Sequence, residues 1–588
     1  MIFSFSLNFS QIIPSDNRIA WTPGIPSGEQ NIHAGLIVNV VEQFGADNSG
    51  NSDVLKAIDD AIFSVASTGG VIFFPKGTYR INGTIKISND KIILRGEGAD
   101  KTKLHFYNPI NACIEIITYG RGIWQGVNGY AKDTTILTVE NGSAFTVGDF
   151  AEIQQDNDTN FMYTKPLWNQ PWAQKVVGQF MQVVAIDGNE ITLKTPLHIT
   201  YQSEFNPQIR PQQLLRNVNI EELYIELKTD SDVSTINYKN AAYGLVKNIE
   251  SYHTKKAHVS SESTIGCEVR NSKFTRSFDY GGGGHGYGVA LGFHTTDWLV
   301  ENNIFDSLRH ALIFSTGANG NVISYNFSQN VLQGSGESNL NQGWNPPDIS
   351  NHGHYAYMNL IEGNSVQEVG ISDYWGPTGP GNVYFRNRVL IEETQDGIWY
   401  NDVTVKQNVI GNSAIIIKDV GGKASNNLEH GNLINGQLFW DNSITDHNLP
   451  NSYYLQSKPA FFESTDWPLY GPTEGFSRKL PAQKKFESSI LSVTTSSPLG
   501  LVEYYLFQNY PNPFNSGTII SYTISKSEFV SIKLYDSLGR LVKVLTSGIK
   551  SGGNHSIHIN TENLSSGMYY YQLASEKFIQ IKKMILLK

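Results

Sequence analysis

The chain has 588 residues, of which 40% are hydrophobic and only 17% are charged, which suits a large globular domain plus at least one smaller one. Its net charge of −10 argues against a nucleic-acid partner, because binding phosphates needs a basic face. The two cysteines, Cys113 and Cys267, cannot form a disulfide framework, and no apolar run is long enough to span a membrane. We therefore expect a monomeric globular protein.

The N-terminal segment, residues 1–30, begins with the apolar run MIFSFSLNFSQIIP. It lacks the basic start of a signal peptide, so we interpret it as a possible signal remnant. Within 44–62, the apolar residues recur at helical spacing, and the stretches 69–87 and 91–106 have the pattern of short strands. A helix followed by strands suits the end of a β-solenoid, where it covers an exposed sheet edge.

An asparagine next to a short apolar strand recurs through the middle of the chain, at Asn248, Asn271, Asn303, Asn326, Asn364, Asn387, Asn408 and Asn432. The successive gaps are 23, 32, 23, 38, 23, 21 and 24 residues. A unit near 23 residues is typical of one three-strand coil of a parallel β-helix. Asparagine at a recurrent corner accepts left-handed geometry and can stack as a hydrogen-bonded ladder. The predicted fold class is therefore all-β, with a parallel β-helix over residues 31–454.

Three further parts interrupt or follow this repeat. Residues 134–202 have the pattern of hairpins in a small inserted β module, with IDGNEI as a tight turn. Residues 455–500 are rich in Ser, Pro, Thr and Lys and are predicted to form a linker. Residues 501–588 alternate between apolar and polar side chains and predict a separate C-terminal β-sandwich.

The segments FGADNSGNSD, GGVIFFPKGTYRINGTI and ILRGEGADKTKL, within 44–106, resemble the opening of the pectate-lyase-like superfamily. The repeats extend this resemblance to about residue 440. It implies a right-handed parallel β-helix in a secreted or surface protein that acts on polysaccharide by elimination or hydrolysis. The reaction stays open, because different sites occur on one common fold.

The C-terminal motifs NYPNPFN (509–515), YDSLGR (535–540), SSGMYYY (565–571) and KKMILLK resemble the C-terminal sorting domain of type IX secretion substrates. This resemblance implies that the type IX secretion machinery is a partner. It also implies export across the outer membrane, to the cell surface or the medium, and a signal peptide upstream of the N-terminal segment.

The two long gaps in the repeat mark loops that can hold a site, because the inside of the tube is packed. The first loop, FDYGGGGHGYG (278–288), and the second, SGESNLNQGWNPPDISNHGHYAY (335–357), both carry histidine, and SLRHALIF lies on the coil between them. If both loops emerge on one side, they wall a groove over that coil. The candidate catalytic residues are Arg309, His310, His352, His354, His285 and, on the next coil, Asp373.

Aromatic rings suit the C–H-rich faces of sugars, and arginine binds carboxylates. The candidate substrate-binding residues are Tyr355, Tyr374, Trp375, Trp344, Arg386 and Arg388. Each of them also fits a residue that packs a loop or points into solvent. His352 and His354 would face the same way in an extended segment, but no third ligand stands at a characteristic spacing, so no metal site is predicted. Whether calcium is required stays open.

A lyase that acts on a uronate must neutralise the carboxylate, remove the C5 proton and protonate the leaving oxygen. Arg309 suits the first role or that of an activated base, His310 or His352 the second, and Tyr355 or Tyr374 the third. The base stays unassigned, because the lysine paired with this arginine in such lyases is not identifiable one coil earlier. SLRHALIF is also similar in outline to the arginine-bearing coil of β-helix lyases that act on alginate or chondroitin. An acidic glycan would be repelled by the net charge of −10 unless a local basic cleft overrides it.

Two alternatives remain from the sequence. A glycoside hydrolase needs two carboxylates about 5–10 Å apart, and the available acids are Asp306, Asp348, Glu362 and Asp373. The signatures of the polygalacturonase branch are absent, which makes hydrolysis the second choice. The third possibility is a noncatalytic β-helix that binds glycans or serves as an adhesin. The sequence thus predicts a secreted lyase of an acidic glycan.

Overall fold

The computed structural model describes residues 12–29, 36–334, 346–389, 397–424, 426–475, 478–493, 505–509, 512–515, 517–524, 527–551, 553–560, 564–575 and 578–587. The chain divides into two compact units. The first comprises Met1–Leu390 and Asp396–Gln483, and the second comprises Ile391–Gln395 and Lys484–Lys588.

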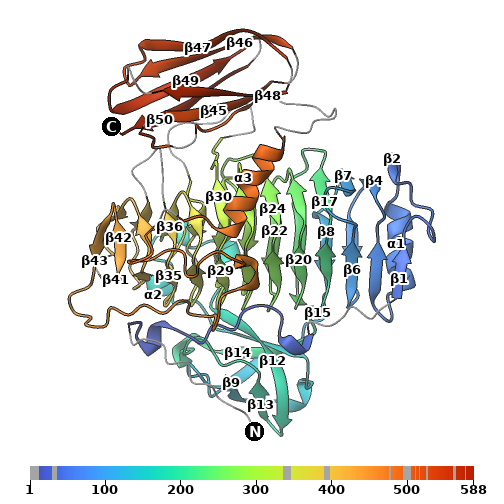
Figure 1. Ribbon diagram of the computed structural model, residues 1–588. Coiled ribbons are helices and arrows are strands. Elements are labelled where there is room, and N and C mark those ends of the chain that lie inside the picture. The colour runs from blue at the N-terminus through green and yellow to red at the C-terminus, as the bar shows by residue number, and fades with distance from the viewer. Residues whose placement is uncertain are drawn as a thin grey trace. The chain divides into compact units, whose positions relative to one another are not determined.

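In the described part of the first unit, three sheets of short strands wind around a common core (Figure 1). Sheet A contains β1 (Leu36–Asn39), β3 (Gly70–Phe73), β6 (Ile92–Arg95), β16 (Asn219–Glu221), β20 (Leu245–Lys247), β23 (Glu268–Arg270), β26 (Leu299–Glu301), β29 (Val322–Ser324), β32 (Leu360–Glu362), β35 (Val383–Phe385), β38 (Asn408–Ile410) and β41 (Leu428–His430). Sheet B contains β2 (Ser49–Asp53), β4 (Gly77–Asn82), β7 (Thr102–Tyr107), β17 (Tyr224–Leu227), β21 (Glu250–Tyr252), β24 (Lys273–Thr275), β27 (Ile304–Asp306), β30 (Phe327–Gln329), β33 (Ser365–Val366), β36 (Arg388–Val389), β39 (Ser413–Ala414), β42 (Asn432–Ile434) and β43 (Gln437–Phe439).

Sheet C completes the coil and carries most of the candidate site. It contains β5 (Ile85–Ile87), β8 (Ala112–Ile117), β18 (Ser234–Lys239), β22 (Ala257–Glu262), β25 (Tyr287–Leu291), β28 (His310–Phe314), β31 (Ile349–Asn351), β34 (Val369–Ser372), β37 (Ile398–Asn401) and β40 (Ile417–Asp419). Neighbouring strands run parallel in all three sheets, except that β42 and β43 are antiparallel. The predicted all-β parallel β-helix is confirmed, and it is right-handed, as parallel crossovers are.

The strands form because one apolar side chain per coil stacks on its counterpart in the next coil. In sheet A the fully buried row is Ile220, Val246, Val269, Val300, Ile323, Ile361, Tyr384 and Val409. Burying one such side chain stabilises the fold by roughly 1.5–3 kcal/mol. The helix predicted within 44–62 is α1 (Leu55–Ser64), which buries Ile58, Ala61 and Ile62 at the blue end of the solenoid in Figure 1.

The predicted asparagine ladder lies at the corner between sheets A and B. The side-chain Nδ2 of Asn303, Asn326, Asn364 and Asn387 each donates to the Oδ1 of the asparagine in the next coil, at 3.0 Å. Asn412 and Asn432 continue the ladder. The prediction is wrong at three positions. Asn248 and Asn271 occupy the left-handed residue before the ladder position, and Asn408 begins β38.

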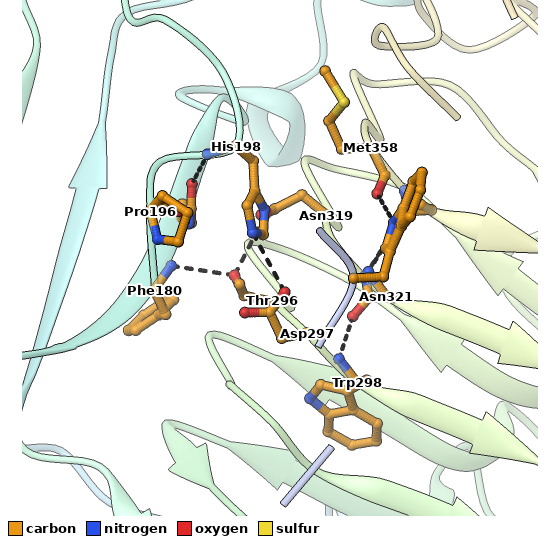
Figure 2. Close-up of polar contacts among 12 residues, drawn as sticks. Phe180, Pro196, His198, Thr296, Asp297, Trp298, Asn319, Asn321 and Met358 are labelled. Atoms are coloured by element: carbon orange, nitrogen blue, oxygen red, sulfur yellow. Dashed lines mark hydrogen bonds and ion pairs between the residues drawn. The ribbon is translucent and has the colours of Figure 1, made fainter. Parts of the chain in front are cut away.

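The inserted module is a closed barrel of β9 (Gln125–Asn128), β10 (Ile136–Val139), β11 (Phe150–Gln154), β12 (Gly178–Asp187), β13 (Glu190–Leu193) and β14 (Gln208–Gln212). It extends beyond the predicted 134–202 at both ends. The predicted tight turn is confirmed, because Asp187 pairs with Glu190 across Gly188. The barrel packs onto the β-helix: the Phe180 amide donates to the Thr296 hydroxyl at 3.2 Å, and His198 meets Asp297 and Asn319 (Figure 2).

The chain after the last coil returns along the β-helix. The Tyr453 amide donates to Glu362 at 2.9 Å, and the Trp467 indole donates to the Tyr325 hydroxyl at 3.0 Å. Phe462, Leu469, Tyr470 and Leu480 form a buried cluster with Tyr325. The linker predicted at 455–500 is therefore wrong over 455–475, which is folded. Residues 481–493 form helix α3 (Pro481–Val493), and residues 494–500 lie outside the described residues.

The second unit contains the predicted C-terminal sandwich. One sheet holds β44 (Tyr505–Leu506), β45 (Gly517–Ile524) and β48 (Gly553–Asn560). The other holds β46 (Glu528–Asp536), β47 (Leu541–Lys550), β49 (Gly567–Ala574) and β50 (Ile579–Leu586). Alternate residues such as Ile520, Ile532 and Tyr571 are buried between the two sheets, which explains the alternating pattern of the sequence.

Candidate functional site

Residues from five consecutive coils come together along sheet C. Tyr287 precedes His310 by one coil in the strand register, and their rings lie 5.3 Å apart. His310 contacts Pro347, and Pro347 packs beside Gly370 and the ring of Trp399. Trp399 in turn donates a hydrogen bond to Glu368. We call Tyr287, Arg309, His310, Glu368 and Trp399 the His310 cluster.

His310 is held in one defined state. Its Nδ1 lies 2.6 Å from the carbonyl oxygen of Pro347, so Nδ1 carries the proton and Nε2 keeps its lone pair. Only 3% of the residue is exposed. Burial, together with the charge of Arg309, lowers the pKa of His310 well below its usual value. The ring is therefore a neutral proton acceptor at physiological pH.

Arg309 supplies a positive charge next to this imidazole. One Nη donates to the carbonyl oxygen of Gly281, and the Nε has no hydrogen-bond partner among the described residues. No carboxylate forms an ion pair with Arg309 in the described part of the chain. Burial raises the pKa of the neighbouring Tyr287 hydroxyl, so this phenol keeps its proton. The cluster thus joins a neutral imidazole, a protonated phenol and a guanidinium that has no carboxylate partner within the described ranges.

Glu368 belongs to the His310 cluster and lies directly before β34. Burial raises its pKa to about 8, despite the hydrogen bond from Trp399. Glu368 follows Asp348, whose carboxylate accepts hydrogen bonds from the Ser328 hydroxyl and from the backbone amides of Gln367 and Glu368. Asp348 therefore positions the turn before β34, while the Glu368 carboxyl is protonated near neutral pH.

A second group, the His352 cluster, follows β31 and comprises His352, His354, Trp375, Tyr374 and Trp172. His352 stacks on Trp375 with ring centroids 6.1 Å apart, and Tyr374 meets Trp375 at 5.1 Å. Burial, with the charge of Arg309, lowers the pKa of His352 to about 4, which shows that Arg309 acts on both clusters. The His352 cluster thus offers aromatic surface within the electrostatic range of Arg309.

The inserted module contributes to the His352 cluster. Its segment 158–175 contains α2 (Thr159–Met162), η4 (Pro166–Trp168) and η5 (Pro171–Ala173). The Trp168 indole donates to the Tyr374 carbonyl at 3.1 Å, and Lys165 pairs with Asp402 at 3.0 Å. Trp172, which is 52% exposed, places its ring 4.4 Å from that of His354. The barrel therefore adds an exposed aromatic ring to this edge of sheet C.

Two candidate histidines have surroundings that differ from the prediction. His354 is buried, neither ring nitrogen has a partner among the described residues, and burial lowers its pKa to about 3. His285 lies in the glycine-rich loop that Arg309 contacts through Gly281 and Gly286. Its ring stands between Asp279 at 2.8 Å and Asp232 at 3.0 Å, and Asp232 also pairs with Lys256. His285 is thus on the predicted side of the helix, but its ring is engaged by carboxylates.

Three further candidates have structural roles. Asp373 is fully buried and accepts hydrogen bonds from Thr378 and Thr404, and a catalytic role for this carboxylate stays a prediction. Arg386 was expected to face solvent, but it is buried, where it binds Glu474 at 3.1 Å and the Tyr470 carbonyl at 2.8 Å. Arg388 lies on β36 of sheet B and donates to Ser365 at 3.2 Å, away from sheet C.

The remaining candidates can be placed briefly. Tyr355 adopts left-handed backbone geometry, and burial raises the pKa of its hydroxyl to about 12. Trp344 lies outside the described residues, as does the stretch 335–345 expected as one wall of the groove, so that groove stays a prediction. Among the described residues, no three His, Cys, Asp or Glu side chains converge as they would around a metal ion.

Four residues of these clusters escaped the sequence reasoning: Tyr287, Glu368, Trp399 and Trp172. Tyr287 had a usable signal, because it precedes His310 by 23 residues, which is one regular coil. Glu368 and Trp399 had none, since the loops between their coils differ in length. Trp172 reaches the site from the insertion, and no repeat relates the two.

The comparisons with known proteins agree with this architecture. Residues 508–587 match the model of the secretion system C-terminal sorting domain. Residues 37–146 match the model of rhamnogalacturonase A/epimerase, pectate lyase-like. The chain carries a sorting domain behind a pectate-lyase-like β-helix. The type IX sorting domain directs export to the cell surface or secretion, and no helix among the described residues is long and apolar enough to cross a membrane. The β-helix match supports a secreted protein that acts on a glycan.

Solved structures resemble the fold only distantly. The tailspike protein gp49 from Pseudomonas phage LKA1 is 15% identical, with a TM-score of 0.49 over 64% of this chain and 64% of that one. The Pseudomonas phage phi297 tailspike gp61 is 11% identical, with a TM-score of 0.43 over 92% and 99% of the two chains. An iota-carrageenase complexed to iota-carrageenan fragments is 11% identical, with a TM-score of 0.23 over 69% and 59%. No curated protein matches the sequence.

Proposed function

We propose that the protein is a polysaccharide lyase that cleaves a uronate-containing glycan by β-elimination at the His310 cluster. One observation carries the proposal: the hydrogen bond from His310 Nδ1 to Pro347 O leaves Nε2 as a neutral acceptor, next to Arg309, whose charge has no carboxylate partner among the described residues. A base with a fixed tautomer beside a cation is what proton removal next to a carboxylate requires.

The reaction assigns one role to each group. The Arg309 guanidinium binds the uronate carboxylate and stabilises the negative charge that develops on it when the C5 proton leaves. His310 Nε2 takes that proton, the electron pair of the C5–H bond forms the C4–C5 double bond, and the bond from C4 to the glycosidic oxygen breaks. The Tyr287 hydroxyl, whose ring lies 5.3 Å from His310, protonates the leaving oxygen.

The His352 cluster supports binding of the neighbouring sugar units. The exposed rings of Tyr374 and Trp172 flank His352 and Trp375 and can stack on pyranose faces. The net charge of −10 disfavours an acidic glycan at a distance. Arg309 offsets this locally, since its charge has no carboxylate partner among the described residues. Arg309 can supply the charge that a calcium ion would otherwise provide, and a chelator tests whether calcium adds to it.

Hydrolysis on the same surface is the second candidate, and Glu368 favours it. A carboxyl whose pKa is about 8 can serve as a general acid. Hydrolysis also needs a second carboxylate that is free to act. The carboxylate whose charge acts on Glu368 is that of Asp348, and its oxygens already accept hydrogen bonds from Ser328 and two backbone amides. Elimination is therefore the better supported reaction.

The test uses purified protein and a panel of uronate polymers. Product formation is followed by the ultraviolet absorbance of unsaturated sugars, beside an assay for reducing ends, with and without a chelator. Absorbance that rises with the reducing ends supports elimination, and reducing ends without absorbance indicate hydrolysis. Glycan binding without either product would make the protein a noncatalytic glycan-binding protein or adhesin.

A further inference from the structure

A cleft of about 710 Å³ lies on the outer face of sheet A, away from both clusters on sheet C. Its floor is made by β23 and β26, and the barrel forms one wall through Gln182 and Lys194. The N-terminal segment around residues 21–26 and the returning segment around residues 454–461 form the other walls. The volume is that of a small-molecule site, and four separate parts of the first unit build it.

The floor of the cleft holds charges that already compensate one another. Arg270 stands 2.7 Å from Glu268 and 3.5 Å from Glu301. Glu268 also accepts the Ile25 amide at 2.8 Å, and Glu301 accepts the Tyr454 hydroxyl at 2.7 Å. These contacts fix the polar groups in place. With Lys194 on the barrel wall, two cations balance the two carboxylates, which leaves little net charge for an ionic ligand.

Asp297 adds a neutral polar group to the same cleft. Burial raises the pKa of its carboxyl well above the usual value. Figure 2 shows Asp297 next to His198 of the barrel, with 3.4 Å between the carboxyl oxygen and Nε2. His198 donates from Nδ1 to Asn319 at 2.8 Å, so the Nε2 that faces the Asp297 carboxyl carries no proton. The carboxylic acid thus presents hydrogen-bonding capacity without charge.

Aromatic rings line the remaining walls. Trp21 is fixed by a hydrogen bond from its indole to the Met358 carbonyl at 2.7 Å, and Tyr243 donates to Gln182 at 3.2 Å. Phe461 is partly exposed at the opposite wall. Rings combined with fixed, mostly neutral donors and acceptors match the apolar faces and hydroxyl groups of a sugar.

We propose that this cleft is a second glycan-binding site that takes neutral sugar units, separate from the catalytic strip on sheet C. It does not depend on the reaction at the His310 cluster. An ionic ligand would leave the Arg270 ion pairs unbalanced, whereas a polyhydroxylated neutral ligand can add hydrogen bonds to them. The site would hold the protein on its polysaccharide while sheet C acts on another part of the chain.

The experiment is calorimetric titration of the full chain with cello-, xylo-, manno- and galacto-oligosaccharides, with oligogalacturonate as the acidic comparison. Phe461→Ala should weaken binding of the neutral oligosaccharide roughly fivefold to tenfold. Phe63→Ala, at an 82% exposed phenylalanine on α1, is the matched control and should leave binding unchanged. Lys194→Ala, at an exposed position, provides a second variant with little risk to folding.

His310→Gln should bind the neutral oligosaccharide like the wild type, which separates this site from the proposed lyase reaction. The proposal is overturned if none of the four neutral series binds, if Phe461→Ala and Phe63→Ala bind equally well, or if only oligogalacturonate binds. A loss of binding in His310→Gln would also overturn it, because it would place the ligand on sheet C.

Discussion

Replacing His310 by glutamine is the sharpest test of the proposed chemistry. Glutamine can keep a donor for the Pro347 carbonyl, which His310 Nδ1 contacts at 2.6 Å, but it cannot accept the C5 proton. Loss of a general base lowers kcat by about 10²–10⁴, or roughly 3–5 kcal/mol in the activation free energy. His310→Leu would in addition leave that buried carbonyl without a partner, at a cost to folding of about 1–3 kcal/mol. Only glutamine therefore separates catalysis from stability.

The pH dependence adds a second measurement on the same residue. Burial and Arg309 lower the His310 pKa well below 6.5, so the base stays neutral as the pH falls from 8 to about 6. We expect kcat/KM to show no acid limb in this range. Arg309→Gln removes the charge and should move the acid limb of the residual activity upward, whereas Arg309→Lys should move it little.

The assay is the initial rate of unsaturated product, with thermal unfolding of each variant as the check on folding. His105→Gln is the control, since His105 lies on β7 of sheet B near Glu226. A His310→Gln protein with the wild-type kcat would refute the assignment of the base. So would an acid limb near pH 6.5 in the wild type, or an equal loss of activity in His105→Gln.

Three further predictions concern the stability of the β-helix and sugar binding at the His352 cluster. Asn364→Ala removes the four ladder hydrogen bonds of its side chain, to Ile323, Asn326 and Asn387, and should lower the free energy of unfolding by about 3–5 kcal/mol; a loss below about 1 kcal/mol in urea titration would contradict the ladder's role. Burial lowers the pKa of His258 to about 3, so the folded state binds fewer protons than the unfolded state. Stability should therefore fall as the pH drops from about 6.5 towards 3, by up to roughly 5 kcal/mol, and less in His258→Leu. Trp172→Ala should raise KM roughly threefold to tenfold with kcat unchanged, while Tyr119→Ala, also at an exposed aromatic ring, should change neither.

The fold could be predicted because its information is local and repeated. Each coil from Asn303 to Asn432 carries its own ladder asparagine and its own apolar rung, so a period near 23 residues predicts the stacking without knowledge of distant contacts. Even so, the sequence could not separate the left-handed residue from the ladder residue after it. Both positions accept asparagine, and this is why Asn271 was counted in the ladder.

The site could be predicted only where it follows the coil register. Arg309, His310 and His352 lie on neighbouring coils because β28 and β31 pair in register, and the charge of Arg309 acts on both imidazoles. Arg386 looked equally available, yet it is buried by the segment near Glu474, which lies 88 residues later in the chain. Trp172 was missed for the same reason. Long-range packing carries no period, so neither burial nor exposure at such positions can be deduced from spacing.

Ion pairs between basic side chains and carboxylates distinguish Arg309 from other basic residues of the first unit. Lys255, Lys256, Arg270 and Arg386 each have a carboxylate partner. Arg309 has none among the described residues, although its Nε is buried. An arginine whose charge has no carboxylate partner among the described residues is available to bind an anionic ligand. Under the proposed reaction, a uronate carboxylate provides the missing partner, and the neutral imidazole of His310 takes the proton next to that carboxylate.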